Sequence, residues 1–169
     1  MVLGHFALAS IAKQTCFQRE NWVFLAGAAV LPDLLDKPAS ILLGVPGRGV
    51  GHSLFILISI TLVAWILSSK LKISPKYLVV GTVMWASHLA TDFVSSGVLL
   101  WPFWGALEPT PPFDFWNKIY EFYIVRSSPE EFWLEVFCIT AAVGLWAVRS
   151  SMPKLARNIP IWNPGGNRK

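Results

Sequence analysis

The sequence predicts an all-α, polytopic integral membrane protein: a bundle of about five hydrophobic helices plus one amphipathic helix at the interface. Composition is the first observation behind this prediction. Hydrophobic residues make up 54% of the 169-residue chain, charged residues make up only 14%, and the mean hydropathy is +0.51. The second observation is a series of apolar segments near the length of a membrane crossing. Such a combination is atypical of a soluble domain.

Five apolar segments follow one another along the chain. Residues 50–69 and 77–100 are long enough to cross a hydrocarbon core of about 30 Å. Residues 131–148 are just adequate. The earlier segments, residues 2–12 and 22–35, are shorter and need a thinned bilayer or flanking polar residues to cross. Ser95, Ser96 and Gly97 predict a kink in the fourth segment, so that its regular part ends near residue 94.

Residues 104–129 are rich in proline and aromatic side chains. Within them, an apolar helical stripe at Phe115, Trp116, Ile119, Tyr120 and Tyr123, with Asp114 as N-cap, predicts a helix lying on the outer interface. We expect one membrane-embedded domain over residues 1–149 and a basic, flexible tail over residues 150–169 that is attracted to anionic lipids. The lipid bilayer is the expected partner. No nucleic-acid motif accompanies the net charge of +4, so nucleic acid is not an expected partner.

Basic residues predict the orientation of the bundle. Five crossings put Lys37, Arg48, Lys118 and Arg126 on one side and the other ten of the 14 Lys and Arg residues on the opposite side. The richer side is expected to be cytoplasmic. The N-terminus then faces outward and the C-terminus faces the cytoplasm.

Six His and Asp side chains lie in or beside the apolar segments. The motifs are GHFALA (His5), LPDLLDK (Asp33 and Asp36), GRGVGHS (His52) and SHLATD (His88 and Asp92). Charged groups at the bilayer centre cost about 2.5–3.5 kcal/mol each on insertion scales, so such residues usually mark a site. The predicted topology brings all six to one level near the extracytoplasmic face, with Pro32 and Pro38 bracketing a helix end at Asp33 and Asp36.

Spacing and ligand chemistry predict a metal site. His88 and Asp92 are four residues apart and share one face of a helix. Imidazole and carboxylate together suit Zn²⁺, Mn²⁺ or Fe²⁺, with zinc favoured. The expected ligands are His5, Asp33, His52, His88 and Asp92. Plainer interpretations stay open: the His88/Asp92 pair could be a structural hydrogen-bonded couple, and Asp33 and Asp36 could merely end a helix.

The order of these motifs, followed by LLWPF at residues 99–103, resembles the family of membrane-bound metal-dependent hydrolases, also described as LexA-binding inner-membrane-associated hydrolases. A more distant similarity links the pattern to helical zinc-dependent phospholipases C and nucleases. Two positions depart from the family pattern. Many members have a His where this chain has Lys37, and another where it has Gly47. The resemblance therefore implies one metal ion, or two completed by carboxylates and water, rather than a full multi-metal cluster.

The function predicted on these grounds is metal-dependent hydrolysis of a phosphoester or another ester, with lipids among the candidate substrates. A divalent ion would activate water, with Asp36 as general base and with Arg48 and Ser53 holding an anionic group. A role for Arg48 as an interfacial anchor is equally open. Two other classes fit the same residues: a proton- or ion-coupled transporter, and a non-catalytic membrane scaffold with a structural metal.

Overall fold

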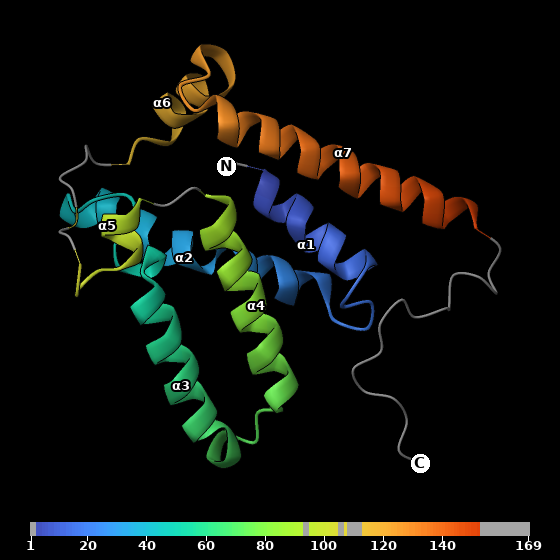
Figure 1. Ribbon diagram of the computed structural model, residues 1–169, viewed down its shortest axis with the longest axis horizontal. Helices are drawn as coiled ribbons and strands as arrows, with labels where there is room; N and C mark the ends of the chain where they lie inside the picture. The colour runs from blue at the N-terminus through green and yellow to red at the C-terminus, as the bar shows by residue number, and fades with distance from the viewer. Residues whose placement is uncertain (1–2, 93–94, 105–106, 108–112, 153–169) are drawn as a thin grey trace.

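The computed structural model describes residues 3–92, 95–104, 107 and 113–152, and within these residues it is all-helical with no strand (Figure 1). The elements in chain order are α1 (Gly4–Gln14), α2 (Trp22–Leu43), the 3₁₀ turn η1 (Val50–His52), α3 (Leu54–Leu71), α4 (Pro75–Thr91), α5 (Ser96–Leu99), α6 (Phe115–Tyr120), the π-helical turn η2 (Glu121–Val125) and α7 (Pro129–Ser151). Most of the predicted C-terminal tail lies outside the described residues.

Helix α2 is longer than the sequence pattern predicts. The Asn21 side chain caps its start by accepting a hydrogen bond from the Val23 N–H (2.8 Å), and Gly44 ends it in the left-handed conformation at φ 66°. The helix continues through Pro32 and Pro38, so the prediction that these prolines bracket a helix end is wrong. Packing against α1, α4 and η1 compensates for the backbone hydrogen bonds that proline removes. Asp33 and Asp36 therefore lie within the helix.

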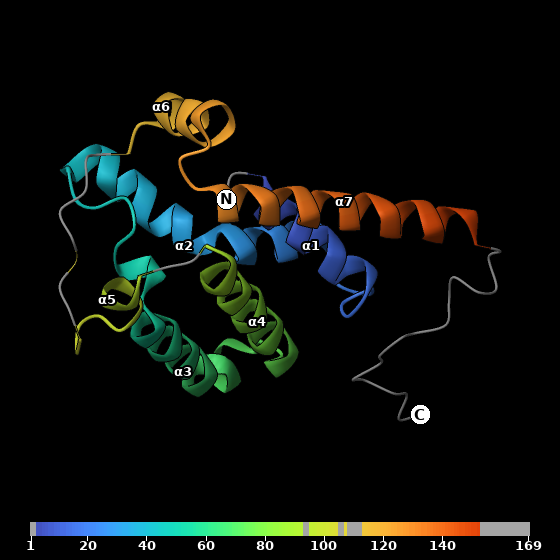
Figure 2. The ribbon, with the colours of Figure 1, turned by 45° about the horizontal axis from the view of Figure 1, so that its top comes forward.

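Small side chains bring three helices close together. Ala9 of α1, Ala29 of α2 and Met84 of α4 belong to one buried apolar cluster. A second cluster joins α1 to α7 through Ala7, Cys138 and Ala142. Figures 1 and 2 show α7 lying along α1, while α3 and α4 descend side by side from α2.

One helix of the described residues, α7, is long and apolar enough to cross a membrane, and only 17% of its most apolar window is buried inside the protein. The shorter apolar stretch Leu54–Ser68 falls below that length because η1 and Ser53 take up the start of the predicted 50–69 span. Helix α4 likewise stops at Thr91, with Asp92 as its C-cap. The number of membrane crossings stays a prediction.

A helix is present where the interfacial helix is predicted, as α6 followed by η2, and its position at an interface stays a prediction. Asp114 caps it as expected, since its side chain accepts a hydrogen bond from the Asn117 N–H (3.0 Å). Phe115, Trp116 and Tyr120 are exposed. The π-helical turn ends at Arg126, which has φ 56°.

Candidate metal centre

Three helix ends and the interior of α2 meet at one place in the fold. His5 lies at the start of α1, His52 just before α3 and His88 in the last turn of α4, which Asp92 caps. These four side chains are 0–4% exposed. Asp33 of α2 faces them and is partly accessible. The structure thus brings together all five predicted metal ligands.

The distances within this cluster are short. His52 Nε2 lies 3.1 Å from His88 Nε2, 3.6 Å from Asp33 Oδ1 and 3.6 Å from Asp92 Oδ2. His88 Nε2 lies 3.9 Å from Asp33 Oδ1, and His5 Nε2 lies 3.5 Å from Asp92 Oδ1. Ligand atoms bound to one ion at about 2.0–2.2 Å are about 2.8–3.6 Å apart in octahedral or tetrahedral geometry. The separations in this cluster match that spacing with small adjustments.

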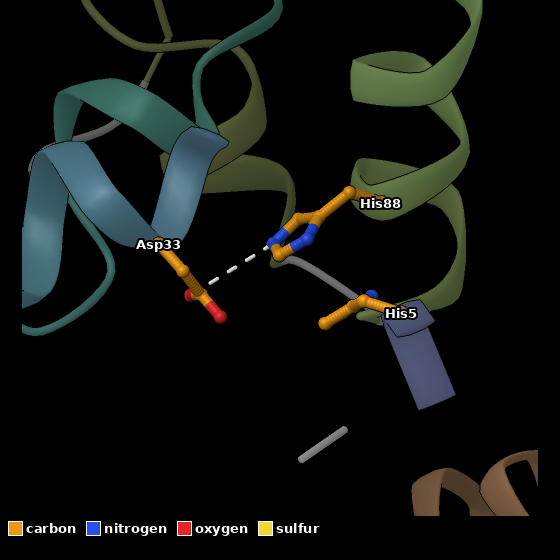
Figure 3. Close-up of side chains that lie close together, drawn as sticks. All are labelled: His5, Asp33 and His88. Carbon is orange, nitrogen blue, oxygen red and sulfur yellow. Dashed lines mark ion pairs between the residues drawn. The ribbon is translucent and has the colours of Figure 1, made fainter. Parts of the chain in front are cut away.

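Two overlapping sets of side chains can each hold an ion. One set is His52, His88 and Asp92, all buried, and the other is His5, Asp33 and His88. Figure 3 shows His88 pointing between Asp33 of α2 and His5 of α1. The His5 and His88 rings stack with centroids 3.9 Å apart.

Buried nitrogen atoms without hydrogen-bond partners also fit a metal. Neither ring nitrogen of His5 makes a hydrogen bond within the described residues, nor does Nδ1 of His88. An unsatisfied buried polar group costs about 1–3 kcal/mol. Coordination of a cation would satisfy a nitrogen of this kind, and the donor set of imidazoles and carboxylates is one that Zn²⁺, Mn²⁺ and Fe²⁺ accept.

Asp36 organises the loop that carries His52. Its Oδ2 accepts hydrogen bonds from the Gly49 N–H (2.7 Å) and from His52 Nδ1 (2.7 Å), and its Oδ1 accepts one from the Gly51 N–H (2.9 Å). With Nδ1 donating to Asp36, the Nε2 atom of His52 is left to face the cluster. Trp85 Nε1 donates to the Gly51 carbonyl oxygen (3.0 Å) and fastens the same loop to α4.

We expect Gly51→Ala to destabilise the protein and to weaken the site. A Cβ atom there would lie 2.6 Å from the Pro32 carbonyl oxygen and 3.2 Å from the Asp36 carboxylate, so the loop must move. Overpacking of this kind costs about 1–3 kcal/mol. Gly144→Ala in α7 is the matched control, because nothing lies within 4 Å of its new methyl group. Thermal unfolding in one detergent checks the pair, and equal melting temperatures for the two variants would contradict the expectation.

Arg48 links the cluster to α7. Its terminal nitrogen lies 2.9 Å from Asp92 Oδ2 and 2.9 Å from Glu131 Oε1. Arg48 is among the predicted site residues, whereas Glu131, which is 6% exposed, is not. The available signal was the pair of acidic residues Glu131 and Glu135, one helical turn apart in an otherwise apolar segment.

Ser53 and Lys37 both lie beside the cluster. The Ser53 hydroxyl donates to the Trp101 carbonyl oxygen (2.5 Å), and the residue is fully buried. This hydrogen bond ties the start of α3 to the turn around residue 101. The contact of Ser53 with substrate stays a prediction. Lys37 Nζ lies 2.5 Å from Asp33 Oδ2, one helical turn away.

The surroundings of His52, in the turn before α3, favour a positive charge. Burial disfavours the charged imidazole, but the hydrogen bond to Asp36 and the carboxylates of Asp92 and Asp33 outweigh it and raise the pKa of His52 above its ordinary value. A proton or a metal ion at this imidazole is stabilised by the same negative charges.

The described residues therefore define an all-helical protein with a buried His and Asp cluster where helix ends converge. The model of the YdjM inner membrane protein family matches residues 1–152, so the chain belongs to that family and is an inner membrane protein. Comparison with curated proteins and with solved structures gives no significant match.

Proposed function

We propose that this protein is a membrane-embedded, metal-dependent hydrolase of a phosphoester or another ester. The observation that carries the proposal is the approach of His52 Nε2 to within 3.1 Å of His88 Nε2 and 3.6 Å of two carboxylates in a buried setting. Zinc is the favoured ion, with Mn²⁺ and Fe²⁺ as alternatives. Five residues would hold it: His5, Asp33, His52, His88 and Asp92.

A divalent ion bound there would lower the pKa of water towards 7 and polarise a phosphoryl or acyl oxygen. The chain's own residues would bind and orient the substrate. The exposed fractions of the Asp33 and Arg48 side chains are 14% and 36%, whereas the three histidines are buried, so substrate would approach from the side of Asp33 and Arg48. The guanidinium of Arg48 carries five N–H donors and suits an anionic oxygen pair.

Asp36 is a positioning residue in this proposal and not the general base that the sequence suggested. Both of its oxygens accept hydrogen bonds, from two backbone N–H groups and from His52. These donors stabilise the carboxylate and make it a poor proton acceptor.

We further propose that several helices are embedded in the membrane and that the site faces the extracytoplasmic side. Exposed apolar side chains cover most of the surface of α3, among them Phe55, Ile60, Leu62 and Val63, and the remaining face packs against α4 through Leu57. A helix that is apolar all round but not buried in the protein is suited to lipid. A lipid substrate could then reach the site from the bilayer.

A structural metal is the second candidate, because the three histidines are almost inaccessible and five protein ligands could close the coordination sphere. Transport is less well supported. A transporter is expected to place polar groups through the depth of the membrane, whereas the predicted His and Asp residues gather in one cluster.

Hydrolysis by the purified protein tests the proposal. Full-length protein in detergent is stripped with chelator, reloaded with Zn²⁺ or Mn²⁺ and offered chromogenic phosphomonoester, phosphodiester and carboxyl ester substrates. We expect metal-dependent turnover of at least one class and its loss in His88→Ala. Bound metal without turnover of any class would instead favour the structural role.

A further inference from the structure

The two oxygens of Asp33 face different neighbours. Oδ1 lies 3.6 Å from His52 Nε2 and 3.9 Å from His88 Nε2, whereas Oδ2 lies 2.5 Å from Lys37 Nζ. A carboxylate that bridges a pair of metal ions places one oxygen on each, with the ions about 3.5–4 Å apart. The ammonium of Lys37 therefore takes the place on Oδ2 that a second ion would need.

The ammonium is held in that place by more than one contact. Lys37 Nζ lies 5.1 Å from the centre of the Phe113 ring, close enough for a cation–π interaction. Phe113 is itself fixed to α2, because its N–H donates to Ser40 Oγ (2.9 Å). Lys37 is thus seated between a carboxylate and an aromatic face and differs from a lysine that extends freely into solvent.

The charges of the cluster also favour Lys37 in place of a second metal ion. Among the described residues linked by its hydrogen bonds and ion pairs, four carboxylates (Asp33, Asp36, Asp92 and Glu131) face two cationic side chains (Lys37 and Arg48). The same buried carboxylates must balance every cation that enters the cluster, so the charge that Lys37 supplies leaves less negative charge to hold a second divalent ion.

We propose that the centre holds a single divalent ion and that Lys37 serves as the built-in cation in place of a second one. This inference rests on the proposed metal centre and goes beyond it by assigning the stoichiometry and a role for Lys37. It accounts for a carboxylate whose second oxygen is occupied by a side chain of its own helix.

Metal counting in Lys37 variants tests the inference. Stripped full-length protein is reloaded with Mn²⁺, freed of excess ion, and examined by elemental analysis and by electron paramagnetic resonance. We expect the wild type to hold one ion per chain with the spectrum of an isolated Mn²⁺. Lys37→His and Lys37→Glu each exchange the cation for a potential ligand, and we expect at least one of them to hold two magnetically coupled ions. Lys70→His, at the exposed end of α3, is the control and should stay at one.

The outcomes separate this inference from the proposed function. A wild type that binds no metal overturns both. Two coupled ions in the wild type overturn the inference alone. A count of one ion in both Lys37 variants also overturns the inference alone, because Lys37 is then not what prevents a second ion from binding.

Discussion

Asp92→Asn is expected to abolish metal binding while leaving the metal-free fold as stable as that of the stripped wild type. The Asp92 carboxylate lies 3.6 Å from His52 Nε2, 3.5 Å from His5 Nε2 and 2.9 Å from Arg48. Asparagine keeps the shape but removes the charge that a divalent ion needs. The asparagine oxygen can still accept a hydrogen bond from Arg48, and Glu131 keeps its charge beside the same guanidinium, which limits the cost of the lost ion pair in the metal-free state.

The expected effect on melting is large. A ligand present at 1,000 times its Kd stabilises the folded state by about 4 kcal/mol, which corresponds to about 8–16 °C for a chain of this size. Added Zn²⁺ should raise the melting temperature of the wild type by that order and leave Asp92→Asn unchanged. Asp114→Asn removes the same charge at the exposed cap of α6 and should behave like the wild type.

A purely structural Asp92 predicts the opposite pattern. Its loss would lower the melting temperature of the metal-free protein clearly, with metal content unchanged. Elemental analysis and thermal unfolding with and without chelator, all in one detergent, distinguish the two patterns.

The helices could be predicted from the sequence because apolar segments are local signals. The end of α2 could not, because the cost of Pro32 and Pro38 is offset by packing against helices that are distant in the sequence. The grouping of His5, His52 and His88 was predicted by assigning their helix ends to one side of the membrane. That assignment needs only the order and direction of the apolar segments. The prediction therefore needed no knowledge of how the helices pack.

Roles that depend on loop conformation and helix pairing were not predictable. Asp36 was a plausible base by residue type, and only the fold of Gly49 to His52 turns its carboxylate towards backbone N–H groups. Glu131 reaches Arg48 because α7 packs along α1, and no sequence motif predicts that helix pairing.

Asp36→Ala in α2 is expected to cost more stability than any single substitution in the loop that this side chain holds. It removes the acceptor of two backbone N–H groups and of His52 Nδ1, all directed at one buried carboxylate. Unsatisfied buried donors cost about 1–3 kcal/mol each, so the three donors together predict a loss of about 3–9 kcal/mol in the free energy of unfolding. His52 would also lose the partner that fixes its ring, and loss of such a partner usually weakens metal affinity about 10–100-fold.

Asp114→Ala is the control for this variant, since it removes a carboxylate that caps α6 on the surface and should cost about 1 kcal/mol with no change in metal affinity. Unfolding in denaturant and metal titration of both variants give the two readouts. A general base predicts a different combination for Asp36→Ala, in which turnover is lost while metal affinity and stability stay near those of the control. That combination would contradict the positioning role and support Asp36 as the general base. A positioning residue cannot be removed without disturbing the loop and the imidazole that it holds.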